Sequence, residues 1–250
     1  MVEFYRSNAI LRIASVALFF SIWQISSLFI NIELLPSPGE VLSKIIEEAK
    51  TNELFFHTLI TLKRVFISFV IAMFIGTFFG IYMGRNKKLN VFLDDWLVLG
   101  LNVPALVIII LCYVWFGLNE MAAILAVSLN KIPMVAVIMR EGARSIEKDY
   151  VEVAKFYKIK KSKFFFKVIF PQLYPYLLSS ARSGLSLIWK IVLVVELLGR
   201  SNGVGFKLYG FFQFFDISGI LAYTLAFVFL IIIIEFIIVR PFERKISVWR

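Results

Sequence analysis

The sequence predicts an all-α polytopic membrane protein with six transmembrane helices, and three observations lead to this fold class. The chain of 250 residues is 60% hydrophobic, and its mean hydropathy is +0.85. Apolar stretches such as 9–30 and 217–239 can each cross a hydrocarbon core of about 30 Å, which needs roughly 20 helical residues. Lysine and arginine gather in short segments between the apolar runs, as expected for a chain that crosses a membrane repeatedly.

The predicted helices cover about 9–30, 57–84, 94–117, 120–140, 174–199 and 216–239, within one domain of residues 1–250. Helices are expected because an open strand edge in lipid would leave backbone groups unpaired. The first apolar run follows Arg6 and Arg12 but is longer than the roughly 7 to 15 residues of a signal peptide. It also lacks a clear small-x-small cleavage site, which favours an uncleaved first helix.

Basic residues predict the orientation of these spans. If the N-terminus is cytoplasmic, the inside segments contain most of the cations, including the basic cluster within 140–167 and the C-terminal residues 240–250. The outside segment 31–55 is instead rich in glutamate. The positive-inside rule therefore predicts cytoplasmic N- and C-termini. It also explains the net charge of +10 better than a nucleic-acid-binding surface does, so no nucleic-acid partner is expected.

The second predicted helix carries a small residue at every fourth position. These residues are Ser68, Ala72, Gly76, Gly80 and Gly84. At 3.6 residues per turn they form one stripe along which a neighbouring membrane helix can approach closely. We interpret the stripe as a packing ridge, and a direct contact with a substrate is the alternative.

Charged residues inside predicted spans are the candidates for a solute path. Lys131 and Lys190 lie at membrane depth, where a charge costs roughly 2.5 to 3.5 kcal/mol on insertion scales. Structural pairing with Glu196 or Glu235, or extension of the side chain towards an interface, is the alternative interpretation. Glu196 lies near the outer end of the fifth predicted helix, where it fits an external gate or partner contact as well as an ordinary helix end.

Several functional classes lack their signatures in this sequence. With one cysteine, Cys112, and one histidine, His57, the chain offers no disulfide, no metal cluster and a thin inventory for catalysis. No G-x-x-x-x-G-K-[ST] stretch is present to bind ATP phosphates. An ion channel and a membrane-embedded enzyme remain alternatives of a different class, although voltage-sensor and TVGYG filter patterns are missing.

A basic segment from Glu152 to Pro171 separates the fourth and fifth predicted helices. Residues 149–157 and 162–169 are expected to form two short helices, and Pro171 and Pro175 to bound the entry to the next span. Such a helical hairpin could dock into another protein. Binding of anionic lipid is the alternative, because each of its lysines near a membrane surface would gain about 1 kcal/mol.

This segment resembles the EAA loop of permease subunits from binding-protein-dependent ABC importers. The resemblance rests on Glu152-Val153-Ala154, followed at matching spacing by Ile169-Phe170-Pro171. Supporting residues in the same order include Leu35-Pro36-Ser37-Pro38, Leu62, Arg64, Asp95, Trp115-Phe116-Gly117, Glu120, Gly184-Leu185, Glu196, Gly203 and Gly205. The chain is most similar to the branch that imports sulfonates, taurine, nitrate and related small anions, with relatives that carry thiamine precursors.

The resemblance implies a MetI-like permease fold in a prokaryotic inner membrane, as one of two permease copies. It also implies an extracytoplasmic substrate-binding protein and a separate ABC ATPase that holds ATP and Mg²⁺, with no cofactor and no enzymatic activity in this chain. The cytoplasmic helical coupling loop 141–173 would dock onto the ATPase through Glu152, Val153, Ala154, Lys158, Ile169 and Pro171. Lys158 stands where the family usually has glycine, so the hairpin turn is expected to differ if this position needs a positive φ.

Overall fold

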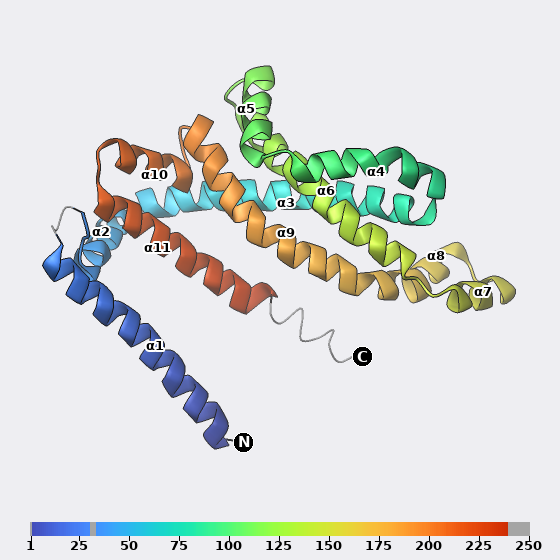
Figure 1. Cartoon of the computed structure of the whole chain (residues 1–250), viewed down its shortest axis with the longest axis horizontal. Coiled ribbons are helices and arrows are strands. Elements are labelled where there is room, and N and C mark those ends of the chain that lie inside the picture. Colours follow the sequence, from blue (N-terminus) through green and yellow to red (C-terminus); the bar gives the residue numbers. More distant parts are fainter. Residues whose placement is uncertain (1, 31–33, 240–250) are drawn as a thin grey trace.

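The structure is a computed structural model that describes residues 2–30 and 34–239, and these residues form helices without any strand (Figure 1). The α-helices are α1 (Val2–Phe29), α2 (Pro38–Lys50), α3 (Glu53–Arg85), α4 (Lys87–Asn102), α5 (Ala105–Phe116), α6 (Glu120–Arg144), α7 (Lys148–Phe156), α8 (Lys161–Phe164), α9 (Phe170–Gly199), α10 (Val204–Gln213) and α11 (Ile217–Ile234). Two π-helical turns, η1 (Phe165–Ile169) and η2 (Glu235–Val239), precede α9 and follow α11. The expected all-helical class is therefore confirmed.

Helices α3, α6 and α9 form the centre of the bundle, with α7 and α8 at one end and α10 towards the other (Figure 1). The small-residue stripe of α3 lies against α6. A Cβ atom added to Gly76 would lie 2.6 Å from Val135 Cβ, and one added to Gly80 would lie 2.5 Å from the Ala136 carbonyl oxygen. These distances leave no room for a methyl group, so the two helix backbones meet more closely than larger side chains would allow.

Local sequence explains where several helices begin. Ser37 and Glu40 form a capping box at α2, in which the Ser37 hydroxyl accepts from the Glu40 N–H. Asn119 caps α6 by accepting from the Ala122 N–H, and Asp216 caps α11 by accepting from the Gly219 N–H. Each side chain satisfies one of the N–H groups that a helix leaves without a partner at its start.

The prediction of a single helix over 94–117 is wrong. This range is divided between α4 and α5, which are bent by 97° at a break around Val103 and Pro104. Pro104 has no N–H group, and its ring disfavours helical geometry at the preceding residue. Val103 accordingly has the extended angles φ −67° and ψ 124°.

The two prolines after the hairpin differ in their position relative to the next helix. Pro171 lies in the first turn of α9, which begins at Phe170, as expected, whereas Pro175 lies inside the helix rather than at its entry. The turn before Pro171 widens into η1, in which the Phe170 N–H donates to the Phe165 carbonyl oxygen. A π turn of this kind changes the register of the hydrogen bonds, which helps a helix to continue past a proline.

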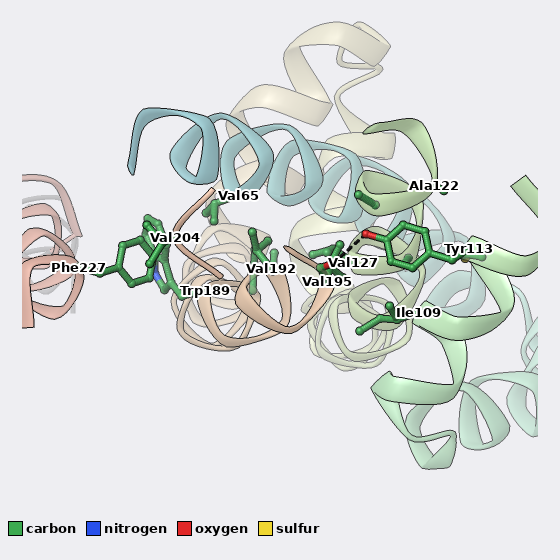
Figure 2. Packing of buried hydrophobic residues seen from close by; sticks show 14 of the residues in the cluster. Val65, Ile109, Tyr113, Ala122, Val127, Trp189, Val192, Val195, Val204 and Phe227 are labelled. Carbon is green, nitrogen blue, oxygen red and sulfur yellow. Dashed lines mark hydrogen bonds between the residues drawn. The ribbon is translucent and has the colours of Figure 1, made fainter. Parts of the chain in front are cut away.

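The principal hydrophobic core joins α3, α5, α6, α9, α10 and α11 (Figure 2). At one end Trp189 of α9 meets Phe227 of α11 edge to face, with the ring centroids 5.9 Å apart and Val204 of α10 beside them. At the other end the Tyr113 hydroxyl of α5 donates to the Val195 carbonyl oxygen at 2.8 Å. The core therefore fixes α9 against both α10 and α5.

Three helices in the described residues are long and apolar enough to cross a membrane, namely α3, α6 and the segment Ile217–Ile237. The bent pair α4 and α5 would make a fourth span if it crosses as one unit. The apolar part of α1, Ile13–Phe29, is shorter, and α9 is less apolar because one of its faces is polar. Length and hydropathy alone therefore identify three or four spans among the described residues, fewer than the six that we predicted.

Candidate functional site

A large open groove runs along α9 and is bounded on its other side by α11. Its volume is about 1620 Å³, and it extends from Phe170 and Pro171 at the start of α9 to Leu193 near its end. Residues of α11 from Thr224 to Ile232, with Glu235 of η2, line the opposite wall, and Val204 and Leu208 of α10 line the end near Leu193. A pocket with mostly apolar walls and a few polar groups is the usual form of a small-molecule site.

Four polar residues of this groove lie on one stripe of α9. Ser179, Ser183, Ser186 and Lys190 all line it, and their spacing of four, three and four residues places them on a single helix face. Hydroxyl groups and an ammonium group are suitable donors to an anion. The stripe therefore explains both why α9 is less apolar than a typical span and which solute charge the groove would favour.

A charge pair crosses the groove towards the end at which the predicted cytoplasmic hairpin lies. The Arg182 guanidinium of α9 lies 3.4 Å from the Glu235 carboxylate that follows α11. Both residues line the groove. Glu235 thus partly balances the charge of Arg182, whereas none of the ion pairs found in the described residues involves Lys190.

The structure separates the two lysines that the sequence proposed for a path. Lys190 is exposed and lines the groove, but Lys131 is only 2% exposed and does not line it. The Lys131 ammonium lies 2.8 Å from the Met134 sulfur, and its Cε would lie 3.6 Å from a Cβ atom added to Gly184. Lys131 therefore sits inside the bundle between α6 and α9.

Glu196 is also buried, at 0% exposure, and belongs to a polar network rather than to the groove wall. The expected alternative pair with Lys190 is not formed. Glu196 instead accepts from Arg64 of α3 at 2.7 Å and from the Thr61 hydroxyl at 2.9 Å. It is also the acceptor for the Gly205 N–H at 2.9 Å.

Arg64 is the residue of this network that sequence reasoning missed as a site. It is 2% exposed, and its guanidinium forms two hydrogen bonds with Glu120 of α6, at 2.9 and 2.7 Å. The same group donates to the Asn202 carbonyl oxygen at 2.8 Å. The available signal was its position inside a predicted span, because a charge there needs a partner.

The hairpin that carries the family motif is built from α7 and α8. Ile159 N–H donates to the Ala154 carbonyl oxygen at 3.1 Å, which closes a Schellman turn at the end of α7. Lys158 occupies the position of this turn that glycine usually takes, and its φ is +47°. The turn therefore has the left-handed geometry that glycine favours, and Lys158 adopts this geometry in place of glycine.

The other motif residues divide into exposed and buried ones. Glu152 and Val153 are exposed on α7, whereas Ala154 is buried. Ile169 is buried in a second hydrophobic cluster with Leu173 and residues of α6, and Pro171 is exposed and lines the groove. Only part of the motif is thus available to a partner, and Ile169 anchors the hairpin to the bundle.

These features define a class of protein, a helical membrane protein with an exposed hairpin and a groove beside it. No cluster of three or more potential metal ligands occurs among the described residues. Residues 72–248 match the family model of the binding-protein-dependent transport system inner membrane component. The chain belongs to this family, which confirms the resemblance found in its sequence.

Similar proteins of known name cover most of the chain. The aliphatic sulfonates transport permease protein SsuC of Bacillus subtilis (strain 168) is 29% identical, over 94% of this chain and 85% of its own length. The bicarbonate transport system permease protein CmpB of Synechococcus elongatus is 30% identical over 82% and 77%. The taurine transport system permease protein TauC of Escherichia coli (strain K12) is 26% identical over 96% and 89%.

Solved structures confirm the MetI-like fold. A crystal form of the methionine ABC transporter MetNI in an inward-facing conformation aligns with a TM-score of 0.68, over 80% of this chain and 98% of that one. The sequence identity is 17%, so the likeness concerns the fold alone. An amino acid ABC transporter aligns with a TM-score of 0.58 and 20% identity.

Proposed function

We propose that this chain is the permease subunit of an ATP-driven importer for a small anion of the sulfonate, taurine or bicarbonate type. The relatives named for these solutes support the substrate class. An extracytoplasmic binding protein delivers the solute, and a separate cytoplasmic ATPase supplies the energy. The observation that carries the proposal is the groove beside α9, with its serines and with Lys190, which forms no ion pair within residues 2–30 and 34–239.

In this proposal the groove is one half of the solute path, and a second copy of the chain completes it. The groove is open along one side, so a single chain does not enclose a solute. Lys190 attracts the anion. The hydroxyls of Ser183 and Ser186 donate to the carbonyl oxygens of Ser179 and Ser183, at 2.7 and 3.0 Å, and turn from them to the anion as it passes. The Arg182–Glu235 pair lies further towards the cytoplasmic end, where an exchange of partners would let the anion leave.

The orientation follows from the distribution of basic residues. The α7–α8 hairpin, with its exposed lysines 158, 160 and 163, lies on the cytoplasmic side together with both chain termini. Glu152 and Val153 contact the ATPase, and the lysines steer the two proteins together. Closure of the ATPase around ATP then moves α9, because Ile169 connects the hairpin to the start of that helix.

Substitution of Lys190 tests the path. In vesicles that contain the complete transporter, Lys190→Met should lower the rate of anion uptake at limiting solute about tenfold, equivalent to about 1.4 kcal/mol. Lys190→Arg keeps the charge and should retain most of the uptake. Unchanged affinity and rate in Lys190→Met, in a variant that assembles normally with its partners, would exclude Lys190 from the anion path.

A further inference from the structure

Helix α10 covers one end of the groove. Val204 and Leu208 line the groove where α9 reaches Leu193, which is the end opposite to Phe170 and Pro171. Val204 is buried against the pair formed by Trp189 and Phe227 (Figure 2). With the orientation proposed above, α10 lies at the outer end, where the solute would enter.

Side chains of α3 and α9 hold the N-terminus of α10. The N–H groups of a first helical turn have no partner within their own helix. Here the Gly203 N–H donates to His57 Nδ1, the Val204 N–H to Thr61 Oγ1 and the Gly205 N–H to Glu196 Oε2, each at 2.9 Å. The start of α10 is thus bound to its neighbours through three hydrogen bonds.

Arg64 fixes the acceptors in place. It binds Glu196 and Glu120 as well as the Asn202 carbonyl oxygen of the segment before α10, and so joins α3, α6 and α9 around this point. Within the low dielectric of a bundle such a network is stable only while its members remain paired. It therefore favours one discrete position of α10 rather than a range of positions.

We propose that Arg64 and Glu196 are positioning residues that hold α10 across the outer end of the groove, and that α10 leaves this position to admit the solute. The inference rests on the proposed function, in which the groove is the path. The inference adds that α10 closes the outer end of the groove and that Arg64 and Glu196 hold it there. Water can replace the hydrogen bonds of the network when α10 moves, so the closed state is reversible.

Access to a cysteine in the groove measures this closure. The single native cysteine, Cys112, is buried, so a thiol introduced as Ser186→Cys reports on the groove. The complete transporter is placed in vesicles with α10 facing outwards and treated with a membrane-impermeant maleimide without ATP. The transporter that carries only Ser186→Cys is the parent for the variants below, and we expect its thiol to be labelled slowly.

Opening the network should raise the labelling rate. Arg64→Met combined with Glu196→Gln removes both charges together, so neither is left buried without its partner. We expect labelling of Ser186→Cys at least tenfold faster than in the parent. Lys63→Met is the matched control, because Lys63 is the exposed neighbour of Arg64, and it should leave the rate unchanged.

A second variant reaches the same state without altering a charge. A Cβ atom on Gly205 would collide with the Leu193 carbonyl oxygen and would lie 2.8 Å from Glu196 Cβ, so Gly205→Ala should displace α10 and also speed up labelling. Parent rates in both variants, in assembled transporter, would overturn the proposal. Full labelling of the parent from the α10 side would also overturn the proposal that α10 closes the groove. It would leave intact the proposed function, in which the groove is the path.

Failure of the underlying function gives a different result. If Ser186→Cys in the parent is labelled from neither side, even during ATP hydrolysis, the groove is not an aqueous path. That outcome would reject the proposed function and this inference together.

Discussion

Replacing Gly80 with alanine tests whether close contact of α3 and α6 stabilises the bundle. The new Cβ atom would lie 2.5 Å from the Ala136 carbonyl oxygen and 2.7 Å from Met139 Cβ. Restoring an ordinary separation of 3.4 Å requires the helices to move apart by about 0.9 Å, the difference between 3.4 and 2.5 Å. A gap of that size removes roughly a quarter to a half of the dispersion energy of the affected contacts.

The net effect follows from two opposing free energies. Overpacking of a close-packed interface costs about 1 to 3 kcal/mol, whereas the better helix propensity of alanine returns at most about 1 kcal/mol. We therefore expect Gly80→Ala to lower the free energy of unfolding by about 1 to 2 kcal/mol. At roughly 2 to 4 °C per kcal/mol for a chain of this size, Tm should fall by about 2 to 8 °C.

Thermal unfolding of the purified permease in detergent provides the assay. Gly210→Ala is the matched control, because no atom lies within 4 Å of a Cβ atom added to this helical glycine. Its Tm should be unchanged or slightly higher. A Tm for Gly80→Ala equal to or above that of the wild type would refute the argument that this glycine allows the helices to meet.

Three further substitutions address the hairpin and the buried lysine. Lys158→Gly should raise the free energy of unfolding by about 1 kcal/mol, since glycine adopts a positive φ without strain, and a lower Tm than the wild type would contradict this. Lys131→Met removes a buried ammonium group whose one hydrogen bond in the described structure goes to sulfur, so Tm should rise and the KM for the solute should stay unchanged. A KM raised tenfold would instead place Lys131 in the path. Glu152→Ala should leave ATP hydrolysis intact but reduce uptake at least tenfold, and normal uptake would exclude Glu152 from coupling.

Long apolar segments were sufficient to predict several helices from the sequence. The ranges 57–84 and 120–140 lie within α3 and α6, because hydropathy over such a length leaves few other structures in a membrane. The break between α4 and α5 was missed, since apolar residues continue on both sides of it and Pro104 alone signals it. Helix α10 is only 10 residues long and follows glycines, so it resembled a loop.

The groove and the network differ in how far local sequence could predict them. The serines and Lys190 share one face of one helix, so their spacing is visible in the sequence. Arg64 and Glu196 are 132 residues apart, and no local pattern connects them. The burial of Arg64 in a polar network therefore becomes visible only when α3 and α9 are packed together.

Transport by the reconstituted system decides between an ATP-driven permease and a channel. The chain is placed in vesicles with or without its partner ATPase, and uptake of labelled taurine, an alkyl sulfonate and bicarbonate is followed with the binding protein and ATP present. We expect at least one of these solutes to accumulate, and only when the ATPase, ATP and the binding protein are all present. Equal flux through the permease alone would contradict the proposed function and indicate a channel.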